Sequence, residues 1–125
     1  MSADLGDRPK PKPIEECRDV YDVLEHVRLR PAMFVRNGSL EELMTLLNGY
    51  GIALHVHGVD EHSGLSPTGP FAQWLSRNHG WSMACGWARA ITDHAEDVPP
   101  LEAFFRLLDE WRASTAAERT AAAES

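Results

Sequence analysis

Three histidines lie close together in the middle of the chain, at positions His55, His57 and His62. Imidazole nitrogens are good ligands for Zn²⁺ and Ni²⁺, and the carboxylates of Asp60 and Glu61 lie in the same segment. The His-x-His spacing is generic, however, and a helix that ends between the first two histidines sends their rings in different directions. We keep this His-rich loop as an alternative site, for a metal ion or a small molecule.

A cysteine beside a histidine is the second arrangement that can do chemistry. Cys85 has His79 and His94 at nearby positions, but it falls in the middle of an expected helix. A thiol there has neither a helix N-terminus nor a strained turn to activate it. Cys17 also lies in an apolar helical pattern, and neither cysteine shows CxxC or zinc-finger spacing. We expect two buried free thiols.

Carboxylates occur in adjacent pairs such as Glu41 and Glu42, which diverge on a helix and so do not form an acid/base pair. No glycine-rich phosphate loop occurs in the sequence. We therefore expect no cofactor, no catalytic site and no enzymatic activity.

The composition narrows the class of partner. The length of 125 residues suits one domain with a single core. The formal net charge is −7. This charge disfavours binding to nucleic acid or to anionic membranes, and it favours a basic partner. The sequence holds no apolar run of about eighteen residues and does not start with an apolar signal region, so we expect a cytoplasmic protein.

The elements that position these residues are helical. Residues 1–13 are rich in proline and charge, which predicts a flexible arm, and residues 114–125 are rich in Ala and Glu, which predicts a frayed tail. Residues 14–113 are then a single helical domain. Its first amphipathic helix is expected over residues 14–29, because apolar residues recur there at helical spacing.

The next helix has a clear start. Pro31 should end the preceding helix at Arg30 and impose an extended segment in which Met33 and Phe34 turn toward the core. Ser39 and Glu42 form a capping box, so a helix begins near Leu40. Two later glycines, at positions 49 and 51, predict either a kink or the close approach of another helix, and we favour close packing.

A long irregular stretch follows from residue 55 to residue 70, and three more helices are expected beyond it. One ends at His79 and Gly80, one is capped by Ser82, and one starts at Leu101. No strand is indicated. The prediction is an all-α protein, a compact bundle or orthogonal array of about five helices with flexible termini.

Residues 27–35, Val-Arg-Leu-Arg-Pro-Ala-Met-Phe-Val, resemble the Arg-Pro-Gly-Met-Tyr-Ile segment near the start of gyrase B type ATPase domains. In that family a helix with a catalytic Glu and a magnesium-binding Asn follows. Here Asn48 lies on the following helix, but Met44 stands where the family has its Glu, and no Asp-x-Gly-x-Gly follows. The resemblance therefore implies a shared local turn and no ATPase activity.

A second resemblance spans roughly residues 20–111. The order Arg-Pro-x-Met-Phe, Gly-Tyr, Phe-x-x-Trp-Leu, Gly-Trp and Ala-Phe-Phe-x-Leu-Leu-Asp-Glu is similar to a group of small uncharacterised bacterial helical proteins. Members of that group resemble immunity proteins encoded beside toxins. The resemblance implies a helical fold and a toxin domain as the partner.

The leading hypothesis is a non-enzymatic acidic protein, monomeric or a small homo-oligomer, that binds and neutralises a basic protein partner. Charge complementarity would speed the association, and tryptophan is enriched at binding hot spots. Trp81, between two expected helices, either caps the core or anchors the partner. The candidate contacts are Glu41, Glu42, Asp60, Glu61 and Trp81.

Overall fold

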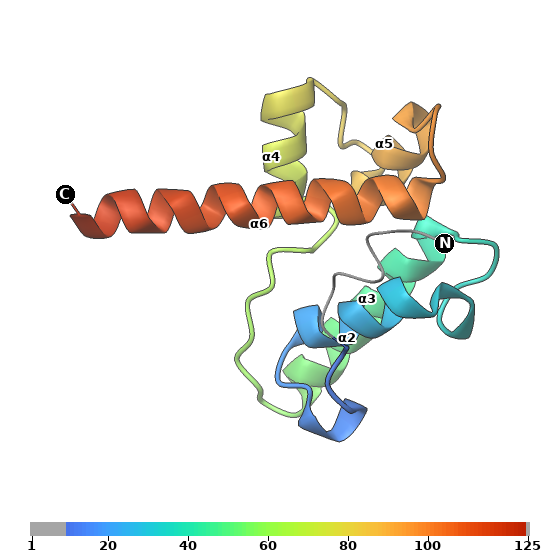
Figure 1. Ribbon diagram of the computed structural model, residues 1–125, viewed down its shortest axis with the longest axis vertical. Coiled ribbons are helices and arrows are strands. Elements are labelled where there is room, and N and C mark those ends of the chain that lie inside the picture. Colours follow the sequence, from blue (N-terminus) through green and yellow to red (C-terminus); the bar gives the residue numbers. More distant parts are fainter. Residues whose placement is uncertain (1–9, 125) are drawn as a thin grey trace.

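The computed structural model describes residues 10–124 of the chain. This range contains five α-helices, two short 3-10 helices and no strand (Figure 1). The elements are, in order, η1 (Ile14–Glu16), α2 (Val20–Leu29), η2 (Pro31–Met33), α3 (Leu40–Val56), α4 (Pro70–His79), α5 (Gly86–His94) and α6 (Pro100–Glu124). The predicted all-α array of about five helices is confirmed. Most of the arm predicted for residues 1–13 lies outside the described residues.

The core forms where α6 crosses the other helices. In Figure 1 α6 runs across the molecule, with α4 and α5 to one side of it and α2 and α3 to the other. At the centre the fully buried ring of Trp87 stacks on Phe104, with 5.0 Å between the ring centroids. Phe71 meets both rings edge-on, at 5.8 and 5.9 Å. These three aromatic residues join α4, α5 and α6 into one core.

The first long helix begins later than the periodicity predicted. Only residues 14–16 turn, as η1, and the chain is extended at Cys17 before α2 starts at Val20. Asp19 is the N-cap of α2, and its carboxylate accepts a hydrogen bond from the amide of Asp22 at 3.0 Å. An aspartate at this position stabilises a helix start, so one helix over residues 14–29 was the wrong prediction.

The segment after α2 is also more compact than predicted. The helix ends at Arg30, as expected, but Pro31 then starts the 3-10 turn η2 and not an extended segment, because its fixed φ suits the first position of a helical turn. Met33 consequently points outward and is 71% exposed, and Val35 is buried in its place. The prediction that Met33 turns toward the core was wrong.

The start of α3 confirms half of the capping box. The Ser39 hydroxyl accepts from the amide of Glu42 at 3.2 Å. The Glu42 carboxylate does not return to the Ser39 amide, which already donates to the carbonyl of Arg36 at 2.9 Å. It accepts instead from the Arg36 amide at 3.0 Å. The helix is thus tied to the turn that precedes it.

Two further boundaries differ from the prediction. The helix expected to start at Ser82 starts at Gly86, because the Ser82 hydroxyl serves a local turn by accepting from the amide of Ala84 at 3.3 Å. Cys85 is therefore an exposed N-cap residue and not a buried mid-helix thiol, and Cys17 is half-buried. Both cysteines are free, as expected.

The predicted frayed tail continues as helix. α6 extends through Glu124, whereas the loss of large apolar residues predicted an end near residue 113. Alanine has the highest helix propensity, so an Ala-rich segment continues a helix that is already nucleated by its packed first half. Residues 116–121 are exposed on all sides, so this part of α6 has no packing of its own.

Candidate functional site

The helix α3 has two apolar sides, and only one of them packs inside the protein. On the inner side Leu40 and Leu43 are buried, and Leu47 and Tyr50 are partly buried against the same core. This side contacts α5 and α6. The spacing of three and four residues places these side chains in one stripe along the inner side.

The opposite side of α3 carries several large apolar side chains that face solvent. We define the outer α3 face by Leu46, Gly49, Ile52, Val56 and Val59. Leu46, Ile52, Val56 and Val59 are 39%, 66%, 71% and 52% exposed, respectively. In the described part of the chain seven large apolar side chains are exposed, and these four are among them. No Asp, Glu, Lys or Arg occurs between positions 42 and 60. Exposed Thr45, Asn48 and His55 lie on the same side of α3 as these large apolar residues. A group of large apolar side chains is normally covered in a monomeric protein, and this face lacks a cover within residues 10–124.

The outer α3 face has the spacing of a helix-packing seam. Gly49, Ile52 and Val56 follow one another at intervals of three and four residues, which places them on one side of the helix. Val59 lies just past the helix end, and its amide donates back to the carbonyl of Leu54 at 2.9 Å. The seam therefore runs from the middle of α3 to the turn that follows it.

The glycines of α3 do not pack where they were expected to pack. A Cβ atom added at Gly49 or at Gly51 would meet nothing within 4 Å, so no helix within residues 10–124 approaches them closely. The prediction of close packing within the domain was wrong. Because Gly49 has no side chain, the backbone of another helix can approach the outer α3 face closely at this position.

Two exposed carboxylates lie at the ends of this face. Glu41 is in the first turn of α3 and its side chain is 62% exposed, with a long contact of 3.8 Å to Arg89. Asp60 follows the helix end and its side chain is 86% exposed, paired at 2.6 Å with the equally exposed His62. Because a helix rises about 1.5 Å per residue, the two carboxylates are separated by roughly 25 Å along α3.

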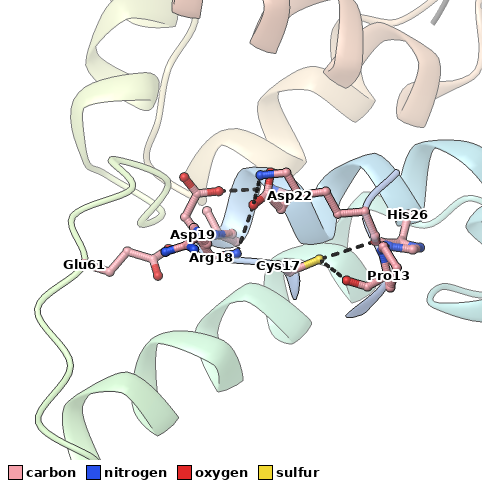
Figure 2. Close-up of polar contacts among 9 residues, drawn as sticks. Pro13, Cys17, Arg18, Asp19, Asp22, His26 and Glu61 are labelled. Carbon is pink, nitrogen blue, oxygen red and sulfur yellow. Dashed lines mark hydrogen bonds and ion pairs between the residues drawn. The ribbon is translucent and has the colours of Figure 1, made fainter. Parts of the chain in front are cut away.

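Glu61 and Glu42, which the sequence also suggested as partner contacts, serve the fold. One oxygen of Glu61 accepts from the amide of Val20 at 2.8 Å, and the other accepts from the hydroxyl of Tyr50 at 2.7 Å. Figure 2 shows Glu61 reaching the start of α2 from the connection that follows α3. Burial, and after it the hydrogen bond to Glu61, raises the pKa of Tyr50 well above its usual range. Glu42 holds the Arg36 amide, so only Glu41 and Asp60 remain for a partner.

The His-rich loop does not gather its histidines. His55 lies in the last turn of α3 and His57 is the residue that ends it, and both are exposed. Nowhere in residues 10–124 do three His, Cys, Asp or Glu side chains come together as a metal ion would require. The segment beyond the loop is held in place by the carbonyl of Leu65, which accepts from the buried indole N–H of Trp87 at 2.9 Å.

Trp81 is covered on both faces by histidine rings. It stacks on His79 and on His94, with 4.6 Å between the centroids in each case and interplanar angles of 23° and 12°. The indole is half-buried and packs against the core. Its ring faces are thus used within the chain, which supports its role as a cap on the core.

The Cys17 thiol shows no sign of activation in this structure. The Cys17 thiol lies 3.8 and 3.6 Å from the carbonyl oxygens of Lys12 and Pro13, to which it donates (Figure 2). Burial is the main cause that raises the pKa of this thiol, and the nearby Asp22 carboxylate adds to it. A thiol with a raised pKa stays protonated and is a poor nucleophile at neutral pH.

Ile52, Val56 and Val59 were not predicted as contacts, because the candidate contacts were acidic residues and Trp81. The available signal was the long stretch without charged residues, which cannot be amphipathic. In the described residues no helix is long and apolar enough to cross a membrane. No protein-family model, curated protein or solved structure matches this chain.

Proposed function

We propose that this chain is a non-enzymatic cytosolic protein that binds and neutralises a basic protein partner, a toxin domain, through the outer α3 face. The observation that carries the proposal is the exposed, charge-free apolar seam on a helix whose other side is already buried. Large apolar patches on soluble proteins mark interaction sites. The toxin part of the proposal is supported by the resemblance to immunity-type proteins.

Burial of the seam provides the affinity. Covering an exposed Ile or Val side chain contributes about 1–2 kcal/mol, since apolar surface is worth roughly 25 cal/mol per Å². Ile52, Val56 and Val59 are each more than half exposed, so each has area left to bury. The summed free energy of burial must exceed the free-energy cost of the entropy that two proteins lose on association. This requires contacts beyond these three side chains.

The carboxylates at the two ends of the seam provide orientation. Glu41 and Asp60 are highly exposed, and the whole chain carries a net charge of −7. A partner that presents an apolar strip with Lys or Arg at both ends matches this pattern. Exposed charges of this kind increase the association rate more than the affinity, and their effect decreases as salt increases.

The test is affinity purification of the tagged chain from its own host, followed by mass spectrometry, with two matched variants. Val56→Lys places a positive charge in the seam, and Met33→Lys makes the same kind of change at an equally exposed position away from it, since both residues are 71% exposed. We expect the unmodified chain and Met33→Lys to recover the same basic protein. We expect Val56→Lys to lose it, with a dissociation constant about a hundredfold higher, or about 2.7 kcal/mol.

Three results would contradict the binding part of the proposal. Equal recovery of the partner by both variants would show that the outer α3 face is not the binding surface. If no form of the chain recovers a protein, there is no such partner. A dimer of this chain that Val56→Lys converts to a monomer would show that a second copy covers the face.

Neutralisation is tested separately, by expressing the recovered partner alone and with each form of the chain and measuring growth. A partner that does not inhibit growth would contradict neutralisation but not binding.

A further inference from the structure

Within residues 10–124, three exposed large apolar side chains do not belong to the outer α3 face, and they gather at a second place. Ile14, Leu29 and Met33 are 56%, 44% and 71% exposed, and all three line one groove, together with the half-buried ring of Phe34. The groove has a volume of about 650 Å³ and lies along the last turns of α2, between η1 and η2. We call it the α2 groove. Its size is within the range of small-molecule sites.

The charge around the α2 groove is opposite to that of the chain. Among the residues that the structure describes, three cationic side chains, Lys10, Arg28 and Arg30, line it with a single carboxylate, Glu25, whereas the chain as a whole carries −7. Arg28 is already engaged, at 2.9 Å from Asp109. In the part of the chain that the structure describes, Lys10 and Arg30 are exposed and no ion pair is found for either.

We infer that the α2 groove binds a small amphipathic anion, an aliphatic chain that ends in a carboxylate. The chain lies on Leu29, Met33 and Phe34, and the carboxylate meets the free cations of Lys10 and Arg30. An arginine fork can bind a carboxylate with two parallel hydrogen bonds. A neutral apolar molecule would leave both cations unused, and an apolar cation would be repelled by them.

This inference is independent of the proposed function. The outer α3 face has no charged residue within it, whereas the α2 groove combines apolar and cationic side chains. The two surfaces therefore bind different classes of ligand. Loss of one activity by mutation leaves the other intact, and this separation allows each proposal to fail on its own.

The first experiment uses dodecanoate, kept below its micelle concentration, and isothermal titration calorimetry with the full chain. We expect one site with a dissociation constant in the micromolar range. Decanoate should bind roughly tenfold more weakly, because two fewer methylene groups are buried. Dodecanol and dodecyltrimethylammonium, with the same chain and no negative charge, should bind at least tenfold more weakly. Equal binding of all three head groups, or many sites per chain, would overturn the inference.

The second experiment locates the site. Amide chemical shifts from ¹⁵N-labelled protein should move at Leu29, Met33 and Phe34 when dodecanoate is added, and not at Ile52 or Val56. Shifts confined to the outer α3 face would overturn the inference.

Variants complete the test. Arg30→Gln removes one exposed cation and Met33→Ser removes an exposed apolar contact, so neither disturbs the core. Each should weaken dodecanoate binding by about tenfold, and Val56→Ser, the matched change on the outer α3 face, should leave it unchanged. Unaltered binding by both groove variants, with circular dichroism that shows a folded chain, would contradict the inference.

Discussion

Tyr50 and Glu61 are joined by a hydrogen bond of 2.7 Å that ties α3 to the connection after it, and the second oxygen of Glu61 holds the Val20 amide at the start of α2. Replacing Glu61 by Ala leaves both donors without their acceptor. We expect Glu61→Ala to lower the free energy of unfolding by about 1–3 kcal/mol, measured by urea denaturation. Asp60→Ala, at the exposed neighbouring carboxylate, should change it by less than about 0.5 kcal/mol. Equal effects would contradict the role given to Glu61.

The two tyrosines of the chain should ionise at unusually high pH. Burial is the main cause that raises the pKa of both, followed at Tyr50 by the bond to Glu61 and opposed at Tyr21 by Arg112. The folded pKa then exceeds the unfolded value of about 10. The tyrosines' contribution to stability is complete below that pH and is lost as pH rises through the folded pKa.

Absorbance at 295 nm during a pH titration measures this directly. The folded chain should form tyrosinate at higher pH than the chain in concentrated urea. Tyr21→Phe leaves Tyr50 as the only tyrosine and isolates its titration. A tyrosine that titrates near its ordinary pKa while circular dichroism still shows the folded helices would contradict the prediction.

The sequence predicted the elements whose signals are local. Ser39 marks the start of α3 and Gly80 marks the end of α4 in a left-handed conformation, because caps act over three or four residues. Asp19 carried an equally local cap signal, but the apolar periodicity upstream outweighed it in the prediction. The predicted helix therefore began six residues before Val20, where α2 starts.

The candidate site was harder to predict, because its geometry depends on contacts between distant residues. Glu61 lies 41 residues from the Val20 amide that it holds, and no spacing rule connects the two. The same holds for Trp81, whose stacking on His94 depends on how α4 and α5 meet. Only Val56 and its neighbours on the outer α3 face had a readable signal, the absence of charge.

Replacement of Trp87 and replacement of Trp81 should lower the free energy of unfolding by different amounts. Trp87 is fully buried, stacks on Phe104 and donates to the carbonyl of Leu65 at 2.9 Å. Trp87→Phe leaves that carbonyl unpaired and opens a small cavity, so we expect a loss of about 2–4 kcal/mol in urea unfolding. Trp81→Phe keeps a ring between its histidines and should cost about 1 kcal/mol or less. A larger loss at Trp81 would contradict its role as a peripheral cap.

The exposed last turns of α6 should open far more easily than the packed first half. Residues 116–121 are exposed, whereas Phe104 and Leu108 are buried. Local opening needs little free energy where no apolar contact is lost. Hydrogen exchange measured by NMR should therefore be at least a hundredfold faster for amides in residues 116–121 than for those of the buried segment. Equal protection along α6 would indicate that another molecule covers its end.

Two glycine replacements should change stability in opposite directions. Gly49 is inside α3, and a Cβ atom there meets nothing within 4 Å, so Gly49→Ala should stabilise the chain by about 0.5–1 kcal/mol. Gly86 has φ of +85°, and a Cβ atom there would lie 3.3 Å from Pro67 and 3.4 Å from Met44. Gly86→Ala should destabilise the chain by about 1–3 kcal/mol, because it strains the backbone and presses on both neighbours. Thermal and urea unfolding of both variants measure the two effects, and a loss of stability in Gly49→Ala would show that this position is covered in solution.

If a partner helix approaches Gly49 closely, the same stabilising variant should bind that partner more weakly, so the gain in stability and the loss of binding would come from one added methyl group.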